Sequence, residues 1–416
     1  MADFCTHWFR LAHDALPPGG RAGLVGTNTV RQNESRAASL GYILENGGVI
    51  TDAISTQVWS GDAAVHVSIV NWEKAPAPGT PGSPQIPGSP QTPGSALVPS
   101  VGEGIQPSRT SPDAPPASDA SPTPDAAESA FRRNAETNVR NARAPRTHRL
   151  AFQRGDAVDS LWETFEVARI NSSLSLGTDV AGALVLTANA GAKKCFTGQN
   201  PVNAGFFLTP EDAREMIVAD PRNREVVWPY MIGRDLVEDY APTRWIIDFA
   251  KRDLFAAKSY VLPFAHVQEH VLPGTLAKAE AEKKAQGKEV TRYTRIAERW
   301  WQFYDHRPGT VAAINSVPRW IALSRTSKRA IFEFVSRDIH ADSKLMVFAF
   351  ADDYSFGILQ SGLHWAWTVA RGSTLKGDQN YTSDTVFDTF PWPQSPTKKQ
   401  MRAVADAALA LRQLRR

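Results

Sequence analysis

The stretch LPPGGRAGLVGTNTVRQNES, residues 16–35, decides the fold of the N-terminal part of this chain. Its Pro-Pro-Gly-Gly sequence is typical of a turn that ends a helix, and Ala22–Val25 then predict a short buried strand. A polar Gly-Thr-Asn loop bounds this strand, and a second helix is expected from about Glu34 to Glu45, where Asn-Gly-Gly ends it. This order is typical of the interior of an enzyme core, although it lies here close to the N-terminus.

The segments on either side extend the pattern. Residues 2–15 predict an amphipathic helix, because apolar side chains recur at helical spacing at Phe4, Trp8, Leu11 and Ala15. Residues 49–54 predict a second strand, and a third strand alternates through Val65, Val67 and Ile69. The order helix, strand, helix, strand, strand favours the end of a mostly parallel sheet with an antiparallel edge strand.

Length and composition narrow the class of protein. The chain has 416 residues, 42% of them apolar, with 12 Trp and 19 Phe, which suits two or three domains with substantial cores. No apolar run is long enough to span a membrane, and no basic-then-apolar segment opens the chain as a secretory signal would. Two cysteines, Cys5 and Cys195, make neither a disulfide framework nor a zinc site, so we expect a cytoplasmic protein.

Residues 74–130 differ from the rest in composition. They hold 14 of the 29 prolines and no aromatic residue, and a hexapeptide, PGSPQI and then PGSPQT, repeats from Pro81. Such a segment lacks the apolar surface to form a core and is predicted to be a disordered linker, with a docking motif for a proline-reading domain as the alternative. Residues 131–149 follow with six arginines and predict either a basic arm that touches phosphates or a solvated surface helix.

The chain is expected to be globular again from residue 150 to 396. Short, aromatic-rich segments predict strands, interrupted by helices: WIIDFA from residue 245, RWIALS from residue 319 and KLMVFAFADDYSFGILQS from residue 344. A Lys/Glu/Ala-rich run at 276–289 predicts an exposed helix, and residues 397–416 a basic terminal helix. We therefore predict an α+β second body.

Several long motifs resemble one known family. Residues 2–72 resemble the second half of the methyltransferase domain in MmeI-like enzymes, which are type II restriction–modification proteins with adenine-specific DNA methyltransferase activity. Further motifs resemble that family's target recognition domain, in the same order: WPYMIGRDL, RWIIDFA, PRWIALSRTSKRAIFEFV, LMVFAFADDYSFGILQSGLHWAWT and YTSDTVFDTFPWP. The resemblance covers nearly the whole chain except the proline-rich insert.

The resemblance implies an α/β fold class: the C-terminal half of a class I (Rossmann-like) methyltransferase sheet in residues 1–73, a disordered insert, and an α+β target recognition domain. Residues 21–26, 49–54 and 64–72 would be the fifth, sixth and seventh strands. The implied cofactor is S-adenosylmethionine, which the family holds on a glycine-rich turn after the first strand. The family's [DN]PP[YF] motif, after the fourth strand, holds the adenine. Residues 1–73 contain no such glycine-rich turn after a strand, and the sequence contains no [DN]PP[YF] motif.

We therefore predict no catalytic residue, leave the cofactor-binding residues unknown, and expect the chain alone not to methylate DNA. In the implied fold the fifth strand pairs with the fourth, so its open edge invites a second polypeptide that supplies the N-terminal half of the domain. A split subunit, a misassigned start, a frameshift product and a remnant all remain open. So do a non-catalytic DNA-specificity subunit, an inactive fragment, and a scaffold that uses the proline repeat.

The implied partner is double-stranded DNA, and four segments could contact it. The first segment is the loop after the first strand, which contains Asn28 and Arg31, with Ser35 nearby. Asn28 and Ser35 could equally cap the next helix. The second segment follows the strand at 320–323, and its side chains could reach phosphates and guanine edges. Its residues are Ser324, Arg325, Ser327, Lys328 and Arg329. The last two segments supply Tyr354, Gln360, Ser361 and His364, and then Arg371 and Lys376. Any one patch could instead be plain solvated surface.

No metal or nuclease site is expected. The adjacent pair Asp352 and Asp353 lacks a nearby E-x-K partner and is predicted to lie in a turn between strands. The histidines are scattered, and no pair has metal-ligand spacing with a third ligand.

Overall fold

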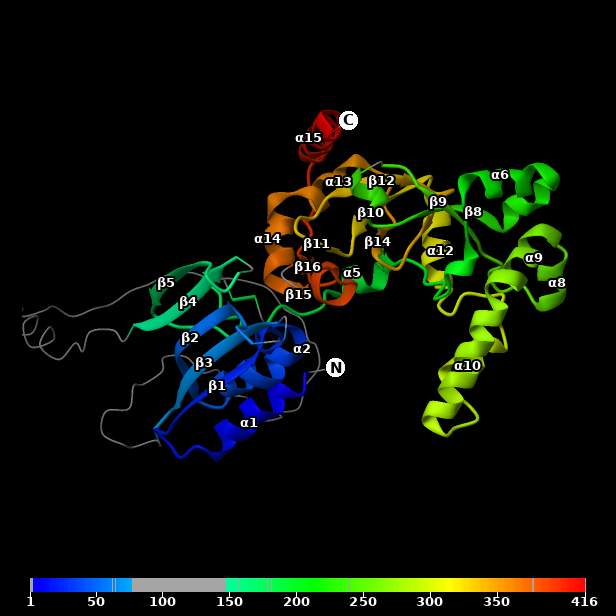
Figure 1. The fold of residues 1–416 in the computed structure, drawn as a ribbon. Coiled ribbons are helices and arrows are strands. Elements are labelled where there is room, and N and C mark those ends of the chain that lie inside the picture. Colours follow the sequence, from blue (N-terminus) through cyan, green and yellow to red (C-terminus); the bar gives the residue numbers. More distant parts are fainter. Residues whose placement is uncertain are drawn as a thin grey trace, which may run out of the picture.

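The computed structural model describes residues 3–61, 63, 65–76, 147–155, 157–177, 179–180, 182–238, 240–375 and 378–415. These residues form an N-terminal body and a larger C-terminal body, joined by the segment at 168–186 (Figure 1). The proline-rich insert from residue 77 onward, the basic arm up to residue 146, and Lys376 lie outside the described residues. Within the described part of the chain, no helix is both long and apolar enough to cross a membrane.

The N-terminal body is built on a five-stranded sheet of order β1-β3-β2-β4-β5. Its strands are β1 (Arg21–Thr27), β2 (Gly48–Val58), β3 (His66–Lys74), β4 (His148–Arg154) and β5 (Leu161–Val167). The three strands expected in residues 21–72 are present. However, the antiparallel strand β3 lies between β1 and β2 rather than at the edge, because the short connection after β2 makes β2 and β3 a hairpin and β1 pairs with the free side of β3.

The helices of this body cover the sheet with one apolar face. They are α1 (Cys5–Ala15), η1 (Asn28–Arg31), and a continuous helical stretch made of α2 (Asn33–Arg36), η2 (Ala37–Gly41) and α3 (Tyr42–Glu45). Helix α1 buries Phe9, whose ring stacks on Trp72 at 5.9 Å between centroids. The predicted stripe of Phe4, Trp8 and Leu11 faces outward instead, because α1 carries a second apolar stripe that packs on the core.

Strands β4 and β5 move the expected boundary between the two bodies. β4 pairs in parallel with β2, β5 pairs with β4, and Leu150 is buried in the same core as Phe9 and Trp72. Arg149, expected in the basic arm, lies in β4 and forms an ion pair with Asp52 of β2. The N-terminal body therefore extends past residue 150, and the expected target recognition domain begins later in the chain.

The C-terminal body contains three sheets of orders β13-β8-β9-β7, β12-β10-β14-β6 and β11-β16-β15. The strands are β6 (Cys195–Thr197), β7 (Phe207–Leu208), β8 (Val227–Met231), β9 (Arg244–Ile247), β10 (Arg319–Ser324), β11 (Thr326–Ser327), β12 (Phe332–Ser336), β13 (His340–Ala341), β14 (Leu345–Phe348), β15 (Ser373–Leu375) and β16 (Asp378–Asn380). Helices interrupt the strands throughout, so the predicted mixture of helices and short strands is confirmed.

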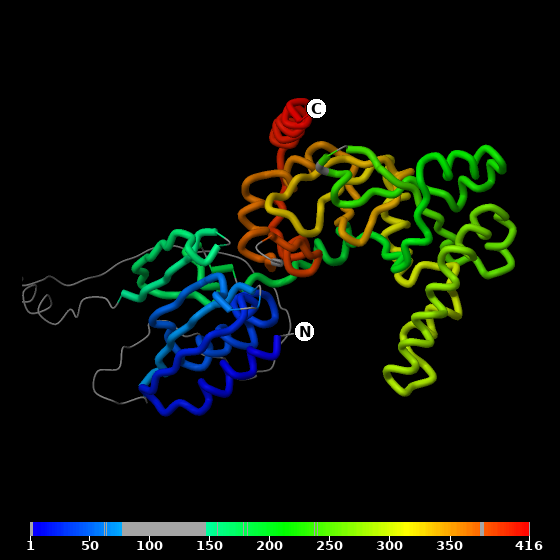
Figure 2. The backbone as a smooth tube through the Cα atoms, in the orientation of Figure 1, coloured from blue at the N-terminus to red at the C-terminus, as the bar shows by residue number. Residues whose placement is uncertain are grey.

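The helices of this body are α5 (Thr187–Ala192), η3 (Ala204–Phe206), α6 (Pro210–Ala219), η4 (Pro221–Glu225), α7 (Asp235–Glu238), α8 (Leu254–Lys258), α9 (Val261–His270), α10 (Leu272–Gln286), α11 (Arg292–Ala297), α12 (Pro308–Asn315), α13 (Asp353–Gln360), α14 (Gly362–Arg371), η5 (Ser383–Phe387) and α15 (Lys398–Arg415). Helix α10 projects from this body on the same side as the N-terminal body, and α15 stands at the opposite side (Figure 2). The predicted exposed helix and terminal helix thus correspond to α10 and α15.

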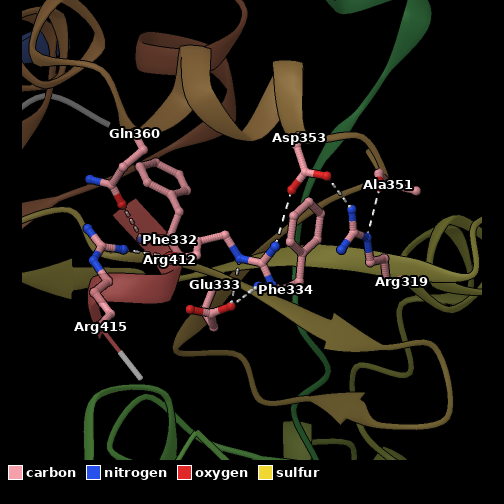
Figure 3. Close-up of polar contacts among 9 residues, drawn as sticks. All are labelled: Arg319, Phe332, Glu333, Phe334, Ala351, Asp353, Gln360, Arg412 and Arg415. Carbon is pink, nitrogen blue, oxygen red and sulfur yellow. Dashed lines mark hydrogen bonds and ion pairs between the residues drawn. The ribbon is translucent and has the colours of Figure 1, made fainter. Parts of the chain in front are cut away.

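Asp352 and Asp353 have structural roles that differ from the predicted turn between strands. Residues 353–360 form helix α13, and Asp352 caps it by accepting a hydrogen bond from the Ser355 N–H at 2.7 Å. Asp353 accepts from Arg319 at 3.0 Å and from Arg412 of α15 at 3.1 Å (Figure 3). This network holds α15 against the sheet, and the described residues contain no cluster of His, Cys, Asp or Glu that could hold a metal ion.

Candidate nucleic-acid interface

A cleft of about 1390 Å³ lies between the two bodies. The N-terminal body contributes Thr29 and residues 32–35, which follow strand β1 and open the next helix. The C-terminal body contributes the ends of β8 and β10, the start of β9, the turn before β14, and parts of β15, β16 and η5. The cleft therefore collects strand ends and loops, which are the positions where side chains are free to meet a ligand.

Two hydrogen bonds join the bodies across this cleft. The side-chain amide of Gln32 donates to the hydroxyl of Thr374 at 2.7 Å, and its oxygen accepts from the Thr374 N–H at 3.2 Å. Gln32 is buried, although it belongs to a polar loop. This bridge places the loop after β1 beside the β15–β16 hairpin.

The predicted loop residues Asn28 and Arg31 serve the N-terminal body itself. The Asn28 amide donates to Thr56, and its oxygen accepts from Ser68 and from the Arg31 Nε at 3.0 Å. Burial lowers the pKa of the Arg31 guanidinium to about 10. Neither residue lines the cleft; Thr29 and Gln32 in the same loop do. Asn28 therefore ties the loop to β2 and β3 and does not cap the next helix.

Only the first half of the second predicted segment, residues 324–329, lies in the cleft. Ser324, Arg325 and Thr326 line the cleft, whereas Lys328 and Arg329 are exposed beyond it. The backbone at Arg325 is held on both sides, because its N–H donates to Lys344 and its carbonyl accepts from Tyr381. Its guanidinium makes no ion pair within the described residues. A fixed backbone with a free cationic side chain suits recognition of an anionic or hydrogen-bonding partner.

The Ser327 hydroxyl, in contrast, donates to the carbonyl of Arg329, so it is already used inside its own turn.

The third predicted patch lies outside the cleft, and most of its polar groups form hydrogen bonds inside the molecule. His364 is fully buried, with Nδ1 2.8 Å from the Leu359 carbonyl and Nε2 3.1 Å from the Tyr381 hydroxyl. Burial lowers its pKa to about 4 and outweighs the opposing effect of the Leu359 carbonyl. The Gln360 amide accepts from the Phe332 N–H (Figure 3) and donates to the carbonyl of Ala330.

Ser361 and Tyr354 complete this patch. Ser361 caps helix α14 by accepting from the His364 N–H at 3.1 Å. Tyr354 is half-buried on α13, and burial, aided by the charge of Asp352, raises its pKa. Neither residue lines the cleft. The polar groups of Gln360, Ser361 and His364 thus hold helices and strands together.

Arg371, in the fourth predicted segment, also has an internal role. Its guanidinium donates to the carbonyls of Val180, Ala183 and Thr385. It therefore fastens the segment that joins the two bodies to the end of α14. The neighbouring Ser373 and Thr374 line the cleft in its place.

Sequence reasoning missed three basic residues of the cleft: Arg234, Arg244 and Lys344. The guanidinium of Arg244 lies over the Phe207 ring, 5.4 Å from its centroid, and its buried Nε has no hydrogen-bond partner among the described residues. Lys344 is anchored through its N–H to Asp342 at 2.8 Å. Arg325 was selected because it directly follows a strand. Arg234 lies after β8, but Arg244 begins β9 and Lys344 precedes β14, so that rule could have found only Arg234.

The described residues do not fit the main contact of S-adenosylmethionine. The cofactor implied by the resemblance requires a glycine-rich turn after a strand, but Gly19 and Gly20 precede β1. Gly26 lies inside β1, where an added Cβ would be 2.7 Å from Val30 and 2.9 Å from Phe9, so this glycine serves packing. No step is therefore derived through the cofactor.

Comparison with known families first assigns a class to the C-terminal body, that of target recognition domains. Residues 186–394, half of the chain, match the family described as the target recognition domain of MmeI. The chain belongs to this MmeI family. No curated protein matches the chain.

The fold resembles that of a solved structure, the type IIL restriction–modification enzyme MmeI in complex with DNA. The TM-score is 0.64 at 18% identity, over 99% of this chain and 44% of that chain. At this identity the likeness establishes a shared fold. This chain thus spans less than half the length of the protein it resembles. The type IIG restriction endonuclease BpuSI gives a TM-score of 0.31 at 8% identity, over 97% of this chain and 43% of that chain.

Proposed function

We propose that this chain recognises a specific sequence in double-stranded DNA, as the target-recognition part of a site-specific adenine DNA methyltransferase. The cleft carries the proposal, because it brings the loop after β1 together with Arg325 and Lys344 of a target recognition domain. The MmeI protein of similar fold was solved in complex with DNA. A duplex in this cleft would contact both bodies.

The cleft offers side chains for both kinds of DNA contact. Lys344 and Arg234 are suited to phosphates, which a point charge or an exposed guanidinium contacts without strict geometry. Arg325 and Arg244 are better placed to read bases: the first has a fixed backbone, and the second lies over an aromatic ring. A positioned guanidinium donates two hydrogen bonds to the O6 and N7 of guanine, the commonest specific contact in the major groove.

Methyl transfer to adenine N6 with S-adenosylmethionine is the proposed activity of the assembled enzyme. The N-terminal body would supply the end of a class I methyltransferase sheet. In support, β1 pairs on one side with β3, and its other side has no strand partner among the described residues. Val25 on this strand is 51% exposed, and Phe4 and Trp8 of α1 are 74% and 54% exposed. A further segment, from a longer chain or a second polypeptide, would pair with β1 and bring the glycine-rich turn and the [DN]PP[YF] motif.

Selection from a pool of randomised duplexes tests the recognition half of the proposal. The chain should enrich one short motif, and its affinity should fall steeply with salt because bound Lys and Arg release counterions. Enrichment of no motif, or no binding at low salt, would overturn it. Adenine methylation, read by sequencing cellular DNA, tests the second half. It should require a polypeptide that carries the two missing motifs; enrichment of a motif without methylation in that case would favour a non-catalytic specificity subunit.

A further inference from the structure

A second concave surface lies in the C-terminal body, at the base of the hairpin made by α10 and α11. It is a pocket of about 640 Å³ between the end of this hairpin and the segment that follows β9. Its lining contains no carboxylate and five lysine or arginine side chains, those of Lys251, Lys288, Arg292, Arg295 and Arg299.

Most of these cations have no internal counter-charge. Lys251, Lys288, Arg295 and Arg299 are exposed, and none makes an ion pair within the described residues. Like charges gathered around one hollow repel each other, so the free protein gains nothing from the arrangement. An anionic partner would remove that repulsion.

Arg292 differs from the other four. Its guanidinium lies over the ring of Tyr304 at 4.4 Å, and it is near Glu282, whose pKa is lowered first by the Tyr293 N–H and also by the charge of Arg292. Tyr304 itself is 51% exposed. Arg292 and Tyr304 thus form one wall of the pocket, and the other four cations remain available to a ligand.

The pocket is held at a fixed position relative to the recognition cleft. Asp342 lines the cleft, and the hydroxyl of Tyr230 shares its single proton between Asp342 and the Gln199 carbonyl. The buried Gln199 amide donates in turn to the carbonyl of His306, which lines the pocket. A short chain of buried hydrogen bonds therefore connects the two surfaces.

The separation of the two surfaces suits a single duplex. Arg244 lines the cleft at the start of β9, and Lys251, seven residues later, lines the pocket. At about 3.3 Å per residue this places them at most roughly 23 Å apart. One turn of duplex is about 34 Å long, so the two surfaces lie less than one turn of a duplex apart.

We propose that this basic pocket binds the sugar–phosphate backbone of the recognised duplex outside the cleft, as a second, sequence-independent anchor. The inference rests on the proposed function, and it adds an interaction that strengthens binding to every sequence alike. Phosphate is the chemical group indicated, because the cations surround a hollow and do not form a flat pair of donors that would match the edge of a base.

The experiment compares the chain with the double variant Arg295→Ala/Arg299→Ala and with Lys398→Ala/Lys399→Ala. The control pair consists of two exposed lysines at the start of α15, on the far side of the body (Figure 1). Binding to a random-sequence duplex is measured by fluorescence anisotropy over a range of salt, and melting temperatures confirm that the variants are folded. Arg295 and Arg299 make no ion pair with any described residue, so their removal should leave the melting temperature unchanged.

The pocket variant should weaken binding at low salt and reduce the slope of log affinity against log salt by about two units, roughly one for each phosphate that the variant no longer binds. The control should keep the original slope, and the motif enriched from randomised duplexes should stay the same in all three proteins. An unchanged slope in the pocket variant would overturn the anchor while leaving the proposed function intact. A changed motif would overturn it too, since the pocket would then read sequence. Absence of duplex binding by the unsubstituted chain would overturn the proposed function and the anchor together.

Discussion

The segments Ser324–Arg329 and Gln360–Arg371 look alike in sequence, since both mix hydroxyl and basic side chains, yet they differ in what their polar groups do. In the first, the backbone of Arg325 is fixed by its neighbours and the side chain is left free beside the cleft. In the second, Gln360, His364 and Arg371 have their polar groups hydrogen-bonded inside the molecule. The difference shows that a polar group's internal partners, rather than its type, decide whether it can bind a ligand.

The largest effect expected from this comparison is a loss of stability at His364. His364→Ala leaves a cavity and removes the partners of the Leu359 carbonyl and the Tyr381 hydroxyl, so the free energy of unfolding should fall by about 3–5 kcal/mol. Urea titration measures this change, with Leu363→Ala, 70% exposed on the same helix, as the matched control. A variant that keeps its stability but changes its DNA motif would reverse the comparison.

Acid should destabilise the protein through the same side chain. His364 has a pKa lowered from 6.5 to about 4 by burial, so the unfolded chain binds its proton first. Stability is therefore complete above pH 6.5 and is lost as the pH falls from 6.5 toward 4, by about 3 kcal/mol for this group. Urea titrations of the protein and of His364→Gln at several pH values isolate the pH-dependent loss of stability that His364 causes. This loss should be missing in the variant. If the free energy of unfolding falls equally with pH in both proteins, His364 is not a buried neutral imidazole.

Arg325 should affect DNA binding and leave stability unchanged. Arg325→Ala is expected to cost about 1–3 kcal/mol of binding to the preferred sequence and to relax the preference at one position, because the proposed role of the guanidinium is to read a base edge. Selection from randomised duplexes, with urea titration alongside, measures both quantities. An equal loss on all sequences would assign Arg325 to a phosphate instead.

Arg329 should show the smallest effect. It is exposed beyond the cleft, so Arg329→Ala should change the free energy of unfolding by less than about 0.5 kcal/mol and leave the enriched motif unaltered. At most it should reduce the salt slope of binding by about one unit. A relaxed sequence preference in this variant would show that the reading surface extends past β11.

Local patterns predicted the N-terminal elements well, and long-range contacts explain the errors. Turn residues and apolar spacing located α1, β1 and the helix before β2, because these signals act within a few residues. The pairing of β4 with β2 joins residues nearly a hundred positions apart, and no local pattern indicates it. The sequence predicts a strand-rich run at helix α13, because the apolar residues of α13 continue those of β14, although Asp352 supplies an N-cap signal.

The candidate site was predicted in part for the same reason. Arg325 and Ser324 could be selected because they end a strand, and strand ends are found locally. The burial of His364 and the internal bonds of Gln360 and Arg371 depend on where distant segments fold back. Gln32 was not selected at all, since its partner, Thr374, is 342 residues away.

The Gln32–Thr374 bridge has a consequence for how a long molecule reaches the cleft. A recognition site inside a chromosome has no free end nearby, so a protein that encloses it must open from the side. Two neutral hydrogen bonds contribute roughly 1–3 kcal/mol together, which thermal motion overcomes without disturbing either core. In the proposed function, breaking this weak bridge would let DNA enter the cleft from the side rather than from an end of the duplex.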